Sequence, residues 1–336
     1  MPIIESSYQA SHIWQNAHFS TIYPSVFRKV PGVHYVRERI ELWDGDFLDL
    51  DWSYADFSLP ASLNKTSKLV ILTHGFLGNT SRPYILGSVK AFNKVGWDAL
   101  AWNHRGLSGE SNRLERLTTH GGSDDLEAVI NHALSLHKYH EIVLVGFSKG
   151  GNISLKYAGE KNACIPKEIK SVVAVSVPAD IQGSVNAMGK EGFYTNRFKR
   201  KLLKFLKNRP TLVSSELLND FEKFRTLDDF TEHYVAPLHG MRDAREYYDQ
   251  CSARHVVNDI KVPSLILNAQ NDPVLSDSCA LLDVAAQSDY IFSEVPKFGG
   301  HCGFYESNND DLYWVDKRIV SFVEKEEEVV SRQIPD

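Results

Sequence analysis

The segment IVLVGFSKGGN, residues 142–152, joins an apolar run to a serine flanked by glycines. Residues 142–145 predict a buried strand, and the polar stretch from Asn152 predicts a helix. Gly146 and Gly150 stand two residues before and two residues after Ser148. In a tight strand-to-helix turn, a Cβ at either position would collide with neighbouring backbone. The segment therefore predicts a sharp turn that presents Ser148 at the carboxyl end of a strand.

Short apolar segments on both sides of this turn alternate with amphipathic helical patterns. The predicted strands are residues 69–73, 99–102, 142–145, 172–177, 265–267 and 290–295. Buried strands separated by helices predict a mostly parallel sheet covered on both faces, hence an α/β fold. Ahead of them, residues 35–42 and 47–52 alternate apolar and polar side chains around Asp44-Gly45, which predicts an N-terminal antiparallel hairpin.

Residues 181–255 interrupt this alternation with helix and loop patterns and no convincing strand. Because they lie between two predicted strands, we interpret them as a helical cap inserted into a single domain of residues 1–336. Within them, NRFKRKLLKFLK at 196–207 predicts a basic amphipathic helix with Phe198, Leu202 and Phe205 on one face. Two interpretations stay open: the helix packs its apolar face on the core, or it makes weak contact with anionic membrane surfaces.

The composition narrows the class of protein. The chain has 336 residues, 43% hydrophobic and 24% charged, which is ordinary for a globular protein. Its net charge of −6 argues against nucleic-acid binding. The sequence has no P-loop, G-x-G-x-x-G or HExxH motif, so we expect no nucleotide cofactor and no metal. The absence of a signal-peptide pattern and the four scattered cysteines predict a cytoplasmic protein.

A second loop is expected beside the serine turn. His74-Gly75-Phe76-Leu77-Gly78 directly follows the predicted strand 69–73. In folds with this serine turn, such a loop supplies one backbone N–H for a developing oxyanion, and the residue after the serine supplies the other. We therefore assign these two donors to Phe76 and Lys149.

The order of residues along the chain selects a base and an acid for Ser148. In this arrangement the serine is followed by an acid and then by a histidine. Of the 13 histidines, only His301 follows residues 265–267 and the loop after them. Asp272 lies in that loop and Asp180 lies in the loop after residues 172–177. Both acids end predicted strands, and we favour Asp272 as the partner of His301.

With these residues in place, the chain resembles the YheT-like branch of the α/β-hydrolases, which is related to plant embryogenesis-associated proteins and yeast proteins that form medium-chain esters. The matching stretches cover nearly the whole chain: NAHF (16–19), RER (37–39), DGDFLDLDW (44–52), HG (74–75), NHRG (103–106), SGE (108–110), GFS (146–148), GGN (150–152), APLHG (236–240), YY (247–248), DP (272–273) and GH (300–301). Lys149 departs from the pattern, which usually has an apolar residue there.

The resemblance implies the α/β-hydrolase fold, with an eight-stranded core and a helical insertion, and carboxylesterase-type activity on acyl esters. We therefore expect a serine esterase for short- to medium-chain acyl esters, with Ser148, His301 and Asp272 as a catalytic triad. The expected partner is a small-molecule ester. An acyltransferase with the same triad, or a ligand-binding protein without activity, are the alternatives.

Overall fold

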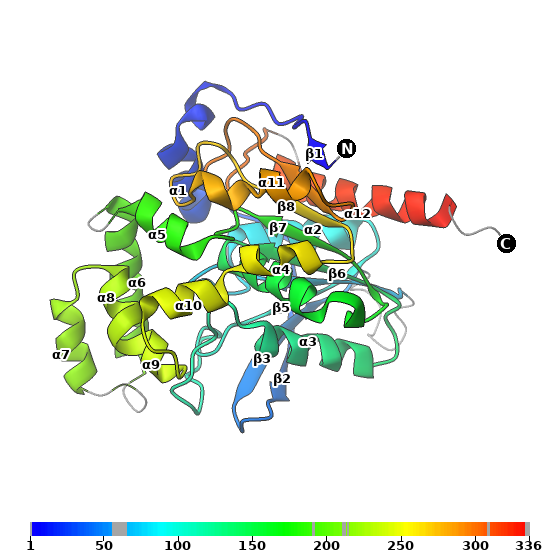
Figure 1. Cartoon of the computed structure of the whole chain (residues 1–336). Helices are drawn as coiled ribbons and strands as arrows, with labels where there is room; N and C mark the ends of the chain where they lie inside the picture. Colours follow the sequence, from blue (N-terminus) through cyan, green and yellow to red (C-terminus); the bar gives the residue numbers. More distant parts are fainter. Residues whose placement is uncertain are drawn as a thin grey trace.

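The computed structural model describes residues 2–55, 66–189, 192–209, 213, 215–307 and 310–332, and within them one sheet of nine strands lies at the centre (Figure 1). The strands are β1 (Ile3–Ile4), β2 (Val36–Glu41), β3 (Phe47–Ser53), β4 (Lys68–Thr73), β5 (Asp98–Trp102), β6 (Glu141–Phe147), β7 (Ile169–Val175), β8 (Ser264–Leu267) and β9 (Ile291–Glu294). Their order is β1-β9-β8-β7-β6-β4-β5-β3-β2.

The α/β-hydrolase fold and its mostly parallel sheet are confirmed, but the expected count of eight strands is one short. The additional strand is β1, which pairs in parallel with β9 at the edge of the sheet. A two-residue strand is too short to produce a periodic pattern in the sequence. The predicted hairpin is present as β2 and β3, which are antiparallel, and β3 also pairs antiparallel with β5.

Two layers of helices cover the parallel strands because successive side chains of a strand point to opposite faces. In β4, Leu69 and Ile71 join the apolar cluster formed with α3 (Ser123–Ser135) and α4 (Lys149–Lys161). Val70 and Leu72 join the cluster on the other face, with α2 (Pro83–Lys94) and α12 (Trp314–Arg332). Burial on both faces explains the continuous apolar runs in the sequence.

The described residues between 181 and 255 form helices joined by turns, and no strand occurs among them. The helices are α5 (Ile181–Met188), α6 (Phe193–Lys207), α7 (Ser215–Lys223), α8 (Leu227–Phe230), a π-helix (Thr231–Val235), α9 (Ala236–Leu238), α10 (Ala244–Cys251) and a short 3-10 helix (Ala253–His255). Figure 1 shows α5–α10 grouped on one side of the molecule. They share an apolar cluster that includes Leu202, Leu206 and Phe230.

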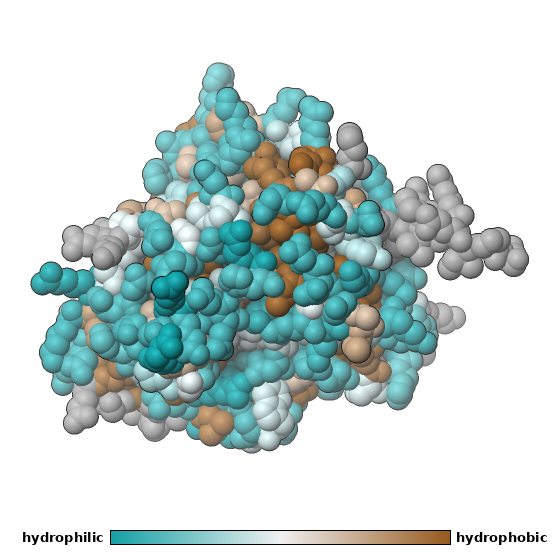
Figure 2. Space-filling model, viewed as in Figure 1, coloured by the Kyte–Doolittle hydropathy of each residue, from teal (hydrophilic) through white to brown (hydrophobic). Residues whose placement is uncertain are grey.

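The remaining helices lie near the N-terminus and between the last strands. They are the 3-10 helix His12–Gln15, α1 (Ala17–Phe27) and α11 (Leu282–Ala285), with further 3-10 turns at Asn162–Cys164, Val257–Asp259 and Asp277–Ala280. On the face drawn in Figure 2 the surface is mainly hydrophilic, and hydrophobic residues gather near the centre, around the place of α11 in Figure 1. No helix in the described ranges has both the length and the apolar character needed to cross a bilayer.

Candidate active site

Ser148 stands in the sharp turn between β6 and α4. Its φ of 53° and ψ of −124° lie in a region that non-glycine residues rarely adopt. A Cβ on Gly146 would overlap the carbonyl of Gly150, and a Cβ on Gly150 would overlap the carbonyl of Thr73. The two glycines are therefore required by the close approach of β6, α4 and the end of β4, and the turn leaves the serine hydroxyl free to contact other loops.

A chain of two hydrogen bonds joins Ser148 to His301 and Asp272. The Ser148 Oγ lies 3.0 Å from Nε2 of His301, and Nδ1 of His301 lies 2.8 Å from Oδ2 of Asp272. The side chain of Asp272 is 1% exposed and that of His301 is 12% exposed. With its proton on Nδ1, the imidazole donates to the carboxylate and accepts from the serine hydroxyl, which is the arrangement of a nucleophile, a base and an orienting acid.

Asp180, the other candidate acid, is engaged elsewhere. Its carboxylate accepts the backbone N–H of Gly183 and thereby caps α5. It also accepts a hydrogen bond from the Ser278 hydroxyl and forms an ion pair with Arg254 at 3.2 Å. These partners lower the pKa of Asp180 against the opposing effect of burial, which is the largest single influence. Of the two acids, only Asp272 contacts His301.

The loop that carries His301 packs against α1. The His301 N–H donates to Thr21 Oγ1 at 2.9 Å, and the Gly300 N–H donates to Asn271 Oδ1 at 3.0 Å. Gly300 has a φ of +60°, and a Cβ there would lie 2.8 Å from Thr21 Oγ1. Sequence reasoning did not find Thr21 and Asn271 as supports of the histidine loop. The one sequence feature near Thr21 was the stretch NAHF (16–19), which matches the family but to which no role was assigned.

Two backbone donors lie near the serine: Phe76 in the loop after β4, which approaches Ser148 at Gly75, and Lys149, the first residue of α4. In the described part of the chain, neither the Phe76 N–H nor the Lys149 N–H donates to another residue. His74 fixes this loop, since its Nδ1–H donates to the Gly75 carbonyl and its Nε2 accepts the His104 N–H. Burial lowers the pKa of His74 to about 3, so the ring stays neutral and can do both.

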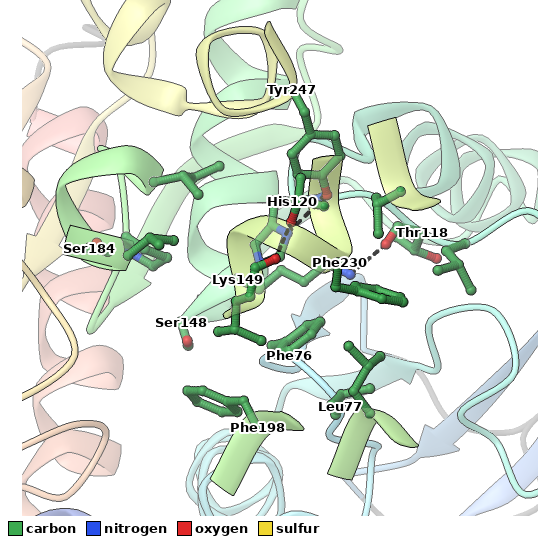
Figure 3. Close-up of a pocket in the computed structure, with 18 of the residues that line it drawn as sticks. Phe76, Leu77, Thr118, His120, Ser148, Lys149, Ser184, Phe198, Phe230 and Tyr247 are labelled. Atoms are coloured by element: carbon green, nitrogen blue, oxygen red, sulfur yellow. Dashed lines mark hydrogen bonds between the residues drawn. The ribbon is translucent and has the colours of Figure 1, made fainter. Parts of the chain in front are cut away.

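The side chain of Lys149 is buried and points away from Ser148 (Figure 3). Its Nζ donates to the Thr118 carbonyl at 2.6 Å. Burial lowers the pKa of this amine to about 7, and Asp125 partly opposes the effect. Nearby, the His120 ring and the Tyr247 hydroxyl are hydrogen bonded at 3.0 Å. These groups form the polar end of a cavity that opens at Ser148 and is otherwise apolar.

Two cavities open from Ser148. The first, called here the apolar pocket, holds about 1070 Å³ of empty space together with its mouth and is lined by aromatic and aliphatic side chains. Figure 3 shows Phe76, Phe198 and Phe230 around it. Its further apolar lining includes Leu77, Leu117, Ile181, Val185, Leu202 and Phe205. Most of these residues come from the loop after β4 and from helices of residues 181–255.

The second cavity, called here the cationic pocket, lies on the His301 side of the serine. Its charged lining residues include Arg82, Arg197 and Lys201, and it also contacts Thr21 and Tyr84. Two of the three cations come from α6, the predicted basic helix. Of the two interpretations left open for this helix, packing of its apolar face on the protein agrees with the burial of Leu202 and Leu206. Arg197 and Lys201 line the cavity.

Among the residues that the structure describes, no group of three or more His, Cys, Asp or Glu side chains is placed to hold a metal ion. The four cysteines are free, and Cys302 is buried directly beside His301 in the sequence. Its N–H donates to Ser176 Oγ, and burial raises the pKa of its thiol. A thiol held in its neutral form is a poor nucleophile, so Cys302 does not compete with Ser148 as the candidate nucleophile of this site.

Comparison with known proteins identifies the family of the chain. The α/β-hydrolase fold family matches residues 68–307. The Escherichia coli (strain K12) protein named "Putative esterase YheT" is 30% identical over 91% of this chain and 89% of its own length. Phospholipase ABHD3 of Mus musculus is 26% identical over 90% of this chain and 74% of its own length.

Solved structures show the same fold at lower identity. The Pyrococcus furiosus esterase Pf2001 has a TM-score of 0.57 and 17% identity, covering 87% of this chain and 91% of that one. Est1E from Butyrivibrio proteoclasticus has a TM-score of 0.55 and 16% identity, covering 87% and 99%. The match over most of the chain, the sheet order and the serine turn together establish that this protein belongs to the α/β-hydrolase fold family.

Proposed function

We propose that this protein is a serine esterase that hydrolyses carboxylic esters through a catalytic triad of Ser148, His301 and Asp272. The observation that carries the proposal is the continuous hydrogen-bond chain through these three side chains. It ends beside two backbone N–H groups, those of Phe76 and Lys149, that have no acceptor among the described residues. A nucleophile, a base and an oxyanion hole are the parts that acyl transfer requires.

In the proposed reaction, Ser148 attacks the carbonyl carbon of the ester while Nε2 of His301 takes the hydroxyl proton. The N–H groups of Phe76 and Lys149 donate to the developing oxyanion. His301 then gives its proton to the leaving alcohol, and the acyl-enzyme remains. Water, deprotonated by the same histidine, attacks the acyl-enzyme and releases the acid. The buried carboxylate of Asp272 stabilises the imidazolium that forms in each half of the reaction.

The acyl group of the proposed substrate is short to medium in length and occupies the apolar pocket. That pocket opens at Ser148 and is lined mainly by carbon atoms from both the core and residues 181–255. In this proposal residues 181–255 act as a cap that shapes the acyl site within a single domain. We also propose a cytoplasmic location, which the four free cysteines favour.

A chain-length series of p-nitrophenyl esters, from acetate to hexadecanoate, tests the proposal. We expect hydrolysis with the highest kcat/KM at a short or medium chain. The Ser148→Ala variant serves as the matched control, since it removes the nucleophile and little volume. Product analysis with added alcohol separates hydrolysis from acyl transfer. An absence of turnover across the series would favour a ligand-binding protein and overturn the proposal.

A further inference from the structure

The apolar and cationic pockets meet at the serine but are not equivalent with respect to the histidine. Phe76, Ser148, Phe198 and Val274 line both cavities, whereas His301 lines only the cationic pocket. If the protein is the serine esterase proposed above, this asymmetry orients the substrate. His301 must reach the oxygen of the leaving alcohol to protonate it. The alcohol part therefore extends into the cationic pocket and the acyl part into the apolar pocket.

The cationic pocket collects three positive side chains from two separate segments. Arg82 directly precedes α2, while Arg197 and Lys201 lie one turn apart on α6. None of the three forms an ion pair with any residue that the structure describes, and no Asp or Glu appears among the described residues that line this cavity. Arg28 also lines it, but its guanidinium is paired with the buried Asp316.

The other basic residues of α6 behave differently from Arg197 and Lys201. Lys199 donates to the carbonyls of Phe224 and Arg225. Lys204 and Lys207 are exposed to solvent. Arg197 and Lys201 are both half-buried and turned toward the cavity beside Ser148. Two basic residues of α6 thus line the pocket, whereas its other basic residues are exposed to solvent or donate to backbone carbonyls.

The three cations interact with one another across the cavity. Burial, and to a smaller extent the positive charges of Arg82 and Arg197, together lower the pKa of Lys201 to about 8. Like charges gathered in a pocket whose described lining has no acidic side chain repel one another and oppose folding. An anion bound between them would relieve this repulsion and would gain charge-assisted hydrogen bonds from guanidinium and ammonium groups.

We propose that the cationic pocket binds an anionic group, a carboxylate or a phosphate, carried by the alcohol part of the ester. Arg82, Arg197 and Lys201 are then specificity-determining residues, because they contact the substrate away from the bond that breaks. The preferred substrate has an apolar acyl chain on one side of the ester and a negative charge on the other.

A set of four esters with one acyl chain and one linker length tests this proposal. The alcohols are ethylene glycol, 3-hydroxypropanoate, ethylene glycol monophosphate and choline, so that the distal group is neutral, carboxylate, phosphate or cationic. We expect one or both anionic esters to exceed the neutral ester in kcat/KM by at least about tenfold, and the choline ester to be the poorest. The two anionic members show whether carboxylate or phosphate is preferred. Equal kcat/KM for all four would overturn the proposal.

Variants locate the effect in the pocket. In Arg82→Gln, Arg197→Gln and Lys201→Gln, we expect the ratio of kcat/KM for the preferred anionic ester to that for the neutral ester to fall about tenfold each. Lys204→Gln is the matched control, because this exposed lysine lies on the same helix outside the cavity, and its ratio should equal that of the wild type. A ratio that falls equally in Lys204→Gln would point to general surface charge and count against the pocket.

Binding without turnover separates this proposal from the proposed esterase function. Calorimetry with Ser148→Ala measures the affinity for the intact anionic and neutral esters. Tighter binding of the anionic ester, weakened by adding Arg197→Gln, supports the cationic pocket even if the wild type hydrolyses neither ester, in which case only the esterase function fails. Hydrolysis of the neutral ester with equal binding of both would leave the esterase function in place and overturn the anion site.

Discussion

At the scale of single residues, the site depends on backbone positions that only particular residues tolerate. Ser148 holds a positive φ, a conformation that costs of order 1–3 kcal/mol for a residue with a side chain. The surrounding structure maintains it through Gly146 and Gly150, which allow three backbone segments to approach closely. This part of the site could be predicted from the sequence, because the glycine spacing follows directly from the steric demand of the turn.

The choice between the two acids gives the first prediction. Asp272→Asn should reduce kcat far more than Asp180→Asn, since an amide cannot stabilise the imidazolium and favours the wrong tautomer of His301. In one studied triad this change lowers kcat about ten-thousandfold. Asp180→Asn should alter stability instead, because Asp180 caps α5 and pairs with Arg254. Steady-state kinetics of both variants decide the matter. A dead Asp180→Asn beside a fully active Asp272→Asn would reverse the assignment.

Lys149 gives a prediction about stability and pH. Its ordinary pKa of 10.5 is lowered to about 7 by burial in the folded protein. Between these pH values the unfolded chain binds a proton that the folded protein has released, so the free energy of unfolding rises with pH. The expected slope is up to about 1.4 kcal/mol per pH unit from this group.

The variant Lys149→Met isolates that contribution, because it keeps an unbranched side chain only one atom shorter and removes the titrating amine. Urea unfolding at several pH values gives the free energy of unfolding of both proteins. Relative to Lys149→Met, the wild type should gain free energy of unfolding as pH rises above neutrality. At acidic pH the difference between the two proteins should stay constant. Parallel curves over the whole range would mean that Lys149 keeps its ordinary pKa.

At the scale of elements, the strands and the hairpin could be predicted because their side chains alternate or remain apolar along buried runs. The interactions that join elements could not. Arg37 and Arg39 on β2 face Asp51 and Asp49 on β3, which buries two acids in a strand that otherwise reads as apolar. Arg105 joins the hairpin turn to α3 by binding Asp46 and Asp125. Such ion pairs depend on the register between strands and on the course of the loops, and the periodicity of hydrophobic residues predicts neither.

Membrane contact by α6 remains a prediction from the sequence. The apolar face of the helix is packed in the protein at Leu202 and Leu206, so any attraction to lipid would be electrostatic and come from exposed residues such as Lys204 and Lys207. Each such charge near an anionic surface contributes about 1 kcal/mol, and salt weakens it. Sedimentation with vesicles rich in phosphatidylserine should therefore show weak binding at low salt that Lys204→Glu with Lys207→Glu abolishes. If the wild type stays in the supernatant at low salt, α6 serves only in packing and in the pocket.

At the scale of the whole molecule, the site is assembled from segments that are far apart in the chain. The residues of the proposed triad could be found from their order in the sequence, because this fold presents its strand ends at one edge of the sheet. The cavities could not be predicted, since they arise where separate segments meet. Arg82 and Lys201 line one pocket although they are 119 positions apart in the sequence, and Thr21 supports His301 from the opposite end of the chain. Contacts between segments so far apart in the sequence leave no local sequence pattern from which they could be predicted.

The identity of the nucleophile is the central claim, and labelling with a fluorophosphonate tests it most directly. We expect the intact protein to take up one equivalent of the probe at Ser148, located by peptide mass spectrometry. Ser148→Ala should take up none while keeping the wild-type circular dichroism spectrum and unfolding midpoint. Its ester turnover should fall by about a millionfold, as the loss of a triad serine does elsewhere. Labelling at another residue, or ester hydrolysis by Ser148→Ala at the wild-type rate, would contradict the account.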